Sequence, residues 1–326
     1  MTNLTVIFVQ SEQPVIYRGW IPDDAINELN NLGVGTESVF ISSIQDLRSK
    51  ITSPSQTLIW PVCYTIGPDP NGPLLTAILD EYNIPYVGLN AATLQYSSKL
   101  RFKDAVDNRT TYASPRYGLY SDQTHSFAVD VPFPAVVKTE YSCNSEGVWL
   151  ASDRSEAEEL ARAARLHTGQ VVFLEQWERY REYTIGYIPA CGDAPPLAAA
   201  MTMTLVDGRP YLDREAKNDN TLLHFDRPDA DVATALEEMT ISVAKSLALD
   251  GHFRMDVVAN SQGKAFPIEL NLLPYLTRNA PNQSYFPLAF ELAGTLDYRG
   301  IVTRIVSHAV ARAWGPERVA EMGLLK

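Results

Sequence analysis

The chain has 326 residues, of which 45% are hydrophobic and 20% charged, and its formal net charge at pH 7 is -12. This composition is typical of a globular protein of two or three domains. The acidic charge excludes a general nucleic-acid-binding surface, which needs clustered Lys and Arg. No apolar run approaches the ~20 residues that span a bilayer, and no secretory signal pattern opens the chain. Its three cysteines are widely spaced and form no disulfide framework, so we expect a cytoplasmic protein.

Strands and helices alternate along the first part of the chain. We predict strands at 5–9, 38–41 and 57–60, and helices at 23–31, 44–51 and 74–82. A βαβ order of this kind predicts a small parallel sheet. No Gly-x-Gly-x-x-Gly follows the first strand, which argues against a dinucleotide site.

The rest of the chain mixes strands and helices less regularly. The predicted strands are 133–138, 171–176, 182–188 and 197–204, and the predicted helices are one from near Ser98, 155–166, 232–249 and 297–313. We therefore predict an α/β (α+β) fold of three domains. A parallel α/β domain at 1–95 is followed by two α+β domains at 96–180 and 181–326.

A hairpin is predicted near the end of the chain. Two runs with period-two alternation flank a turn at residues 260–263, which is the usual signature of a β-hairpin. A four-residue turn would place Arg254 opposite Glu269 and Asp256 opposite Pro267.

One face of this hairpin carries chemistry. Because side chains alternate between faces, Arg254, Asp256, Glu269 and Asn271 are expected on the same face. Carboxylate and amide oxygens suit Mg²⁺ bound together with substrate phosphates, and an arginine suits a developing negative charge. A solvated face with a weak cross-strand ion pair is the alternative. His252 falls on this face by the same parity, with packing at the strand end as its alternative role.

Five features of the sequence occur in an order typical of one enzyme superfamily. They are Lys99 before a helix, Lys138 ending a strand before a loop, Glu175-Gln176-Trp177 followed by Glu182, Glu215-Ala216-Lys217, and Arg254-x-Asp256 followed by Glu269-x-Asn271 and Pro274. This order resembles the ATP-grasp superfamily, and most closely its D-alanine–D-alanine ligase branch. The resemblance covers residues 86–310 well and the first 85 residues in outline. Taken singly, each lysine is equally consistent with a solvent-facing side chain.

The resemblance implies an ATP-grasp fold in which the second and third domains clamp ATP. The residues implied at the nucleotide are Lys99 and Lys138 on the α- and β-phosphates, Ser142, Ser145 and Gly147 in a loop over the phosphates, Glu175, Gln176 and Trp177 at adenine, Glu182 on the ribose, and Lys217 on the γ-phosphate. Compact lysine cations and backbone N–H groups are suited to phosphate oxygens.

The resemblance also implies the catalytic and metal-binding residues. Arg254 and Lys217 would be catalytic, with Arg254 stabilising the tetrahedral intermediate and the acyl phosphate. Asp256 and Glu269 would hold one Mg²⁺, and Glu269 and Asn271 a second, with Mn²⁺ as a substitute. Such a site works mainly by positioning and by neutralising charge.

The implied reaction is ATP-dependent ligation of a carboxylic acid to an amine, such as an amino acid, through an acyl phosphate, with release of ADP and phosphate. Two alternatives stay open. One is a non-catalytic ATP-binding regulatory module, and the other is an ATP-grasp enzyme that cyclises its substrate. No nucleic-acid or membrane partner is expected, and a homodimer is the commonest soluble assembly.

The sequence departs from the family where the amino-acid substrates would bind. Only Glu12 could replace the family's amine-binding glutamate, and Tyr275 and Ala280 stand where a glycine and a serine are expected. The candidate substrate residues are Glu12, Tyr275, Arg278 and Asn279, with Arg278 as a clamp for an acceptor carboxylate. Unmatched polar groups would reject D-alanine, so we predict a different substrate in a specialised biosynthetic pathway.

Overall fold

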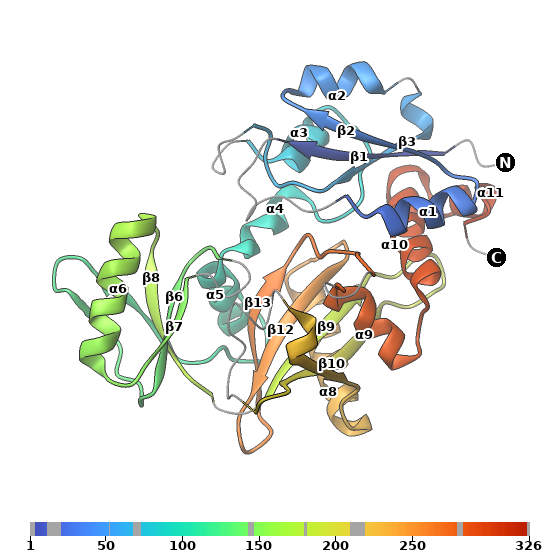
Figure 1. Ribbon diagram of the computed structural model, residues 1–326. Helices are drawn as coiled ribbons and strands as arrows, with labels where there is room; N and C mark the ends of the chain where they lie inside the picture. The colour runs from blue at the N-terminus through green and yellow to red at the C-terminus, as the bar shows by residue number, and fades with distance from the viewer. Residues whose placement is uncertain are drawn as a thin grey trace.

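The computed structural model describes residues 4–11, 21–51, 53–67, 73–142, 147–178, 181–208, 219–278 and 283–324. Their strands form three sheets, one of three strands and two of five (Figure 1). The first sheet spans residues 5–61, the middle sheet 117–176 and the third sheet 181–271. The predicted domain boundaries at 95/96 and 180/181 remain a prediction.

The first sheet is parallel, as predicted, with β1 between β2 and β3. Its region contains β1 (Thr5–Ser11), α1 (Asp23–Asn31), β2 (Gly35–Ile41), α2 (Ile44–Lys50), β3 (Thr57–Pro61), α3 (Leu75–Glu81) and α4 (Ala91–Leu94). Val6 and Phe8 of β1 face one apolar core, and Ile7 and Val9 face another. A strand buried on both faces reads as a continuous apolar run.

The middle sheet is antiparallel, with the order β5-β4-β8-β6-β7. Its region contains α5 (Lys99–Arg109), β4 (Tyr117–Ser121), β5 (Ser126–Phe127), β6 (Ala135–Thr139), β7 (Val148–Ala151), α6 (Arg154–Thr168) and β8 (Val172–Gln176). Alanines of α6 pack on one face of the sheet. The other face carries Lys138 and Glu175, because side chains alternate along β6 and β8.

The third sheet is also antiparallel, with the order β11-β10-β9-β12-β13. Its region contains β9 (Arg181–Ile188), β10 (Leu197–Leu205), β11 (Leu223–Asp226), α8 (Ala230–Ser246), β12 (Phe253–Ala259), β13 (Ala265–Asn271), α9 (Tyr285–Ala293), α10 (Tyr298–Trp314) and α11 (Pro316–Glu321). Helices α5 and α8 share a core with one face of this sheet, and α9 and α10 share a core with the other.

Four strands are not among the predicted elements, namely β4, β5, β7 and β11. Each has five residues or fewer. Strands this short give too few alternating positions for a period-two pattern to be recognised.

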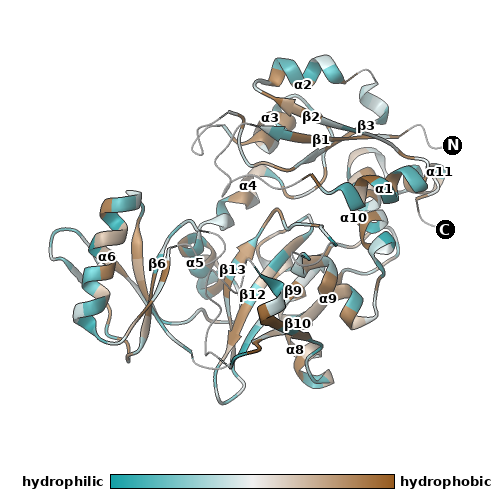
Figure 2. Cartoon of the chain, in the orientation of Figure 1, coloured by the Kyte–Doolittle hydropathy of each residue, from teal (hydrophilic) through white to brown (hydrophobic). Residues whose placement is uncertain are grey.

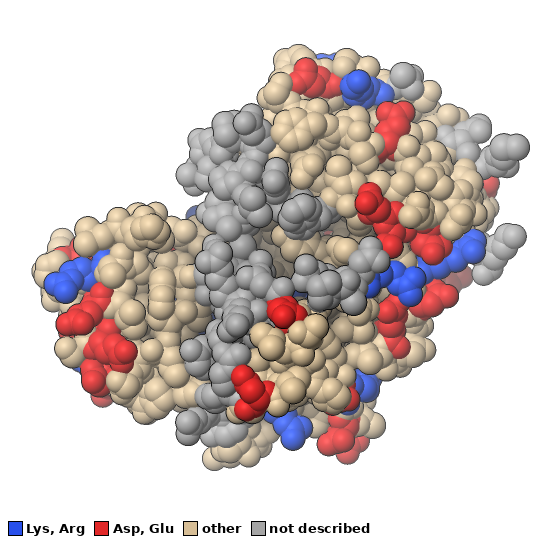
Figure 3. All heavy atoms as spheres, in the orientation of Figure 1, with Lys and Arg blue, Asp and Glu red and all other residues tan. Residues whose placement is uncertain are grey.

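Hydrophobic residues predominate along the strands, and hydrophilic residues are frequent along the helices (Figure 2). In the view of Figure 3, acidic side chains gather over α6, and Lys and Arg are scattered over the face. Within the described ranges, no helix is both long and apolar enough to cross a membrane.

Candidate active site

The predicted hairpin is confirmed, but its predicted pairing is wrong. Arg254 lies opposite Asn271 and Asp256 opposite Glu269, and a bulge follows Asp256 because Val257 pairs with Pro267. Pro267 has no N–H to donate to the ladder, and bulges are one place where a sheet accepts proline.

The four polar residues nevertheless share a face. The loop from Ala259 to Ala265 is one residue longer than predicted, and the bulge adds a second one-residue shift. A single shift would move the side chains of β13 to the other face, but two shifts cancel. The prediction that these four residues share a face is therefore correct, although the predicted register is wrong.

Asp256 is the centre of this polar cluster. Arg254 donates from Nε to Oδ1 at 3.0 Å and from Nη2 to Oδ2 at 2.9 Å. Thr184 donates to Oδ1 at 2.8 Å, from the neighbouring strand β9. Asn271 Nδ2 lies 3.3 Å from Asp256 Oδ2 and 3.5 Å from Glu269 Oε1. The residues predicted as catalytic and metal-binding on the hairpin are thus in mutual contact.

Arg254 keeps its charge although it is largely buried. Burial alone would lower the pKa of its guanidinium, but the carboxylates of Asp256 and Glu269 outweigh burial and raise that pKa above its ordinary value. The guanidinium also lies 5.5 Å from the ring centre of Tyr285. A fixed, permanently charged arginine suits a site in which negative charge develops.

Lys99 connects the hairpin to the middle region. It is the first residue of α5, whose N-cap Ser98 accepts from the backbone N–H of Arg101 at 3.1 Å. Its ammonium lies 3.1 Å from Glu269 Oε2 and donates to the carbonyl and hydroxyl of Ser142 at 2.9 and 3.0 Å. Lys99 and Ser142, which are predicted to bind phosphate, are therefore connected to Glu269, a predicted metal ligand.

A second charged cluster lies on the middle sheet. Lys138 of β6 and Glu175 of β8 form an ion pair with 2.5 Å between Nζ and Oε1, and Lys103 of α5 contacts Oε2. Burial raises the pKa of Glu175, but the two lysines overcome burial and hold that pKa below its ordinary value. Lys103 is not among the predicted site residues, although it lies one helical turn after Lys99.

The other described residues predicted at the nucleotide belong to both the middle and the third regions. Gln176 ends β8 and donates from Nε2 to Glu178 at 2.8 Å. Trp177 is half-buried, and Glu182 lies in β9 opposite Met203 and Val258. At Gly147, which has a φ of 72°, a Cβ would collide with Thr139. That position therefore favours glycine.

Four predicted site residues lie outside the described residues, namely Glu12, Ser145, Lys217 and Asn279. Arg278 is described but does not join the polar cluster. Its Nη2 lies 3.2 Å from Glu291 Oε1, and its guanidinium lies 5.0 Å from the ring centre of Tyr298. Its role as a carboxylate clamp remains a prediction.

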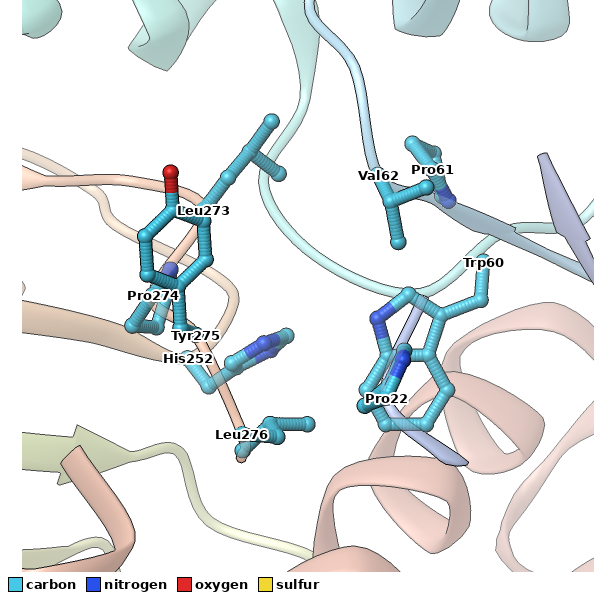
Figure 4. A pocket seen from close by; sticks show the side chains of 9 residues that line it. All are labelled: Pro22, Trp60, Pro61, Val62, His252, Leu273, Pro274, Tyr275 and Leu276. Carbon is cyan, nitrogen blue, oxygen red and sulfur yellow. The ribbon is translucent and has the colours of Figure 1, made fainter. Parts of the chain in front are cut away.

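A small hollow lies between the end of β3 and the segment after β13 (Figure 4). Its lining is mostly apolar and comprises Pro22, Trp60, Pro61, Val62, His252, Leu273, Pro274, Tyr275 and Leu276. The hydroxyl of Tyr275 points away from His252 in Figure 4. Crevices beyond the carboxyl ends of parallel strands are common ligand sites.

His252 has the packing role that was the alternative to a place on the polar face. Its ring lies 6.0 Å from the ring of Trp60 and 5.7 Å from that of Phe286, measured between centroids. Burial lowers its pKa to about 3. His252 is therefore a neutral, aromatic part of the wall.

The polar cluster has the donors that a magnesium ion requires. Among the described residues, no three His, Cys, Asp or Glu side chains converge. A cation here would depend on Asp256, Glu269 and Asn271, completed by substrate phosphates and water, which is how Mg²⁺ is commonly held. The two carboxylates already attract positive charge, since Arg254 and Lys99 contact them.

Comparison with known proteins identifies related sequences and folds. Residues 116–307 match the family model described as D-ala D-ala ligase C-terminus. The D-alanine–D-alanine ligase of Pseudomonas fluorescens is 28% identical over 239 residues, which cover 72% of this chain and 70% of that protein. The ligase of Pseudomonas putida (strain GB-1) is 24% identical over 280 residues, which cover 85% and 84%.

Solved structures share the architecture. The D-alanine–D-alanine ligase of Bacillus anthracis complexed with ATP superimposes with a TM-score of 0.67 at 15% identity, over 95% of this chain and 98% of that chain. The VanG D-Ala:D-Ser ligase of Enterococcus faecalis gives 0.66 at 14% identity, over 94% and 99%. The predicted fold, with an N-terminal parallel sheet and two α+β regions, is confirmed.

Proposed function

The chain belongs to the D-alanine–D-alanine ligase family of ATP-grasp C–N ligases, and from this we propose that it uses ATP to join a carboxylic acid to an amine on substrates other than D-alanine. The family and the enzyme class predicted from the sequence are confirmed by the match over residues 116–307. The choice of substrate, the use of two Mg²⁺ ions and the residue roles are the proposal.

The hairpin cluster is the observation that carries the proposed chemistry. A carboxylate oxygen of the substrate attacks the γ-phosphorus of ATP, and the bond from that phosphorus to the ADP oxygen breaks. The amine nitrogen then attacks the acyl carbon, phosphate leaves with the electron pair of the C–O bond, and the amine proton is released. The first step spreads negative charge over the phosphoryl oxygens, and the second places it on the oxygen of the tetrahedral acyl carbon. The fixed guanidinium of Arg254 would stabilise the acyl phosphate and this tetrahedral intermediate.

The other residues bind and orient. Lys99 and Lys138 would hold the α- and β-phosphates, and Lys217 would reach the γ-phosphate. Asp256, Glu269 and Asn271 would hold the magnesium ions, which when bound neutralise phosphate charge. Glu182 would bind the ribose, and Glu175, Gln176 and Trp177 would lie along adenine. No side chain of the protein needs to become covalently attached to the substrate.

The apolar hollow supports a substrate other than D-alanine. Among the described residues, Trp60, Val62 and Tyr275 give the lining of the hollow an aromatic and aliphatic character. Sites that discriminate by hydrogen bonding reject ligands whose polar groups do not match. Free, buried Cys63 and Cys191 agree with the proposed cytoplasmic location, and a homodimer is part of the same proposal.

The test is ADP release with Mg·ATP, hydroxylamine and a panel of carboxylic acids, because hydroxylamine intercepts an acyl phosphate whatever the true amine is. We expect ADP and hydroxamate with one class of acid, and loss of both in Asp256→Asn. Turnover of D-alanine as fast as the best acid would contradict the proposed substrate. Bound ATP without ADP release from any acid would favour the regulatory module, and the mass of the natural product distinguishes cyclisation.

A further inference from the structure

Lys103 forms a buried charged triad with Glu175 and Lys138, and the proposed reaction gives Lys103 no role. The side chain of Lys103 is fully buried, and those of Glu175 and Lys138 are 4% and 10% exposed. Each oxygen of Glu175 contacts one lysine ammonium. Fully buried lysines are rare unless they are paired, so a specific arrangement keeps Lys103 here.

The three residues come from different elements that meet at one place. Helix α5 lies between the middle sheet and β13 (Figure 1). It presents Lys99 to Glu269 of the hairpin and, one turn later, Lys103 to Glu175 of the middle sheet. The ammonium of Lys103 also lies 5.5 Å from the ring centre of Tyr117, a distance at which a cation and an aromatic ring attract each other.

The sum of the charges explains why two lysines are present. Glu175 paired with Lys138 alone would cancel the charge of that lysine, and a neutral pair attracts a phosphate only weakly. With Lys103 on the second oxygen of Glu175, the triad carries a net charge of +1. Lys138 is its most exposed member, so the net charge is presented there. The nearest further carboxylate on α5, Asp107, is bound by Ser114 at 2.7 and 2.9 Å.

We propose that Lys103 is a positioning residue for nucleotide phosphates: it neutralises Glu175, so that Glu175 can hold Lys138 in place without cancelling its charge. This inference rests on the proposed binding of ATP at the face that carries Lys138. It separates two tasks, because Glu175 orients Lys138 and Lys103 preserves the charge that Lys138 presents.

The test compares Lys103→Met with the double variant Lys103→Met/Glu175→Gln. The single variant leaves a neutral pair, whereas the double variant leaves Lys138 with its charge and a glutamine oxygen that can still accept from it. Kd values for ADP and for adenosine are measured by calorimetry on the full chain. Lys245→Met, on the exposed side of α8, is the matched control.

We expect Lys103→Met to weaken ADP binding about 10- to 100-fold, the range for losing a charge-assisted contact, while its adenosine Kd stays within about twofold. The double variant should recover most of the ADP affinity when that affinity is expressed relative to the variant's own adenosine affinity, which removes any contribution of Glu175 at adenine. Lys245→Met should behave like the unmodified protein. A packing role for Lys103 would instead weaken adenosine and ADP in parallel. That result, or a double variant as weak as the single one, would overturn the proposal.

Two further points keep the test decisive. If Lys103→Met does not fold, as judged by thermal unfolding, the double variant still decides, because the charge explanation expects its ratio of adenosine Kd to ADP Kd to match that of the unmodified protein. A clearly lower ratio would overturn the proposal. The binding measurement is also independent of turnover. Normal ADP affinity without hydroxamate formation would count against the proposed ligase and leave the role of Lys103 standing, whereas absence of ADP binding in the unmodified protein would overturn both.

Discussion

The hairpin cluster and the hollow beside β3 lie close together in sequence at residues 252–256 and 269–276, yet they are opposite in character. In the hairpin cluster, Arg254, Asp256, Glu269 and Asn271 each have a charged or hydrogen-bonding partner. Arg254 is held by both oxygens of Asp256. In the hollow, the walls are aromatic and aliphatic, and its histidine is neutral. Under the proposed function, ionic contacts serve the chemistry and apolar contacts serve the selection of the substrate, so we expect that the two can be altered separately.

The largest effect is expected at the hairpin. Arg254→Lys keeps the charge but loses the planar, two-point contact with Asp256, so hydroxamate formation should fall about 10²- to 10³-fold with little change in ADP affinity. Steady-state kinetics and calorimetry measure the two quantities. Arg318→Lys, at an exposed ion pair on α11, is the control. Equal loss of ADP affinity would show that Arg254 serves binding and not the chemical steps.

The pH dependence of the free energy of unfolding tests whether His252 is shielded from water in the wall of the hollow. The unfolded chain protonates His252 near its ordinary pKa of 6.5, whereas burial lowers that pKa to about 3 in the folded protein. The unfolded state therefore binds more protons below pH 6.5, and stability falls as the pH falls. From pH 6.5 to about pH 4, the loss from this group is about 3 kcal/mol.

The matched variant for this measurement is His252→Phe, which keeps an aromatic ring against Trp60 and Phe286. Urea unfolding across this pH range should give a shallower pH dependence for the variant than for the unmodified protein. Parallel curves for the two proteins would mean that water or a counter-charge reaches His252.

Selectivity should respond to Tyr275 without loss of the nucleotide. Tyr275→Gly removes an apolar wall of the hollow, so kcat/KM for the preferred acid should fall about tenfold, the size of effect expected for lost apolar contact. Tyr275→Phe should stay near the unmodified value, because the hydroxyl points away from His252 (Figure 4). Kinetics with the best acid from the panel measure both variants. A Tyr275→Phe variant as impaired as Tyr275→Gly would assign the role to the hydroxyl.

The smallest effect on stability is expected at Arg278. Its partly exposed pair with Glu291 should contribute less than about 1 kcal/mol to stability, so Arg278→Ala should unfold at nearly the same urea concentration. If Arg278 clamps an acceptor carboxylate, the acceptor KM rises in this variant. An unchanged acceptor KM would remove the clamp role and leave only the contacts with Glu291 and Tyr298.

The alternation of side chains along each strand predicts which residues form the site better than the predicted cross-strand partners do. The shared face of Arg254, Asp256, Glu269 and Asn271 follows from local geometry alone, whereas their partners depend on the length of the loop and on a bulge beside Pro267, neither of which alternation determines. For Lys103, by contrast, local geometry is not enough to predict a role. Nothing in the sequence distinguishes a buried lysine from an exposed one, because its burial depends on Glu175, which lies far along the chain on a different element.

Long-range contacts also explain why the role of Arg278 and the shortest strands could not be predicted from the sequence. Arg278 resembles a free clamp in the sequence, but Glu291 from α9 and Asp24 from α1 contact its side chain and its backbone. Most helices and the longer strands were predictable because their periodicity is local, but α9 was not among the predicted elements. The partners of surface arginines and the shortest strands were not, because tertiary packing decides them.

One core is shared by the first sheet and by helices that end the chain. Leu4, Phe8 and Leu29 pack in the same apolar cluster as Ile301 and Ile305 of α10, and α10 and α11 lie beside α1 in Figure 1. Arg312 of α10 donates to the backbone carbonyls of Tyr86, Gly88 and Asp250. An engineer who grafts the first 95 residues of a relative onto this chain must therefore graft a matching α10 with them.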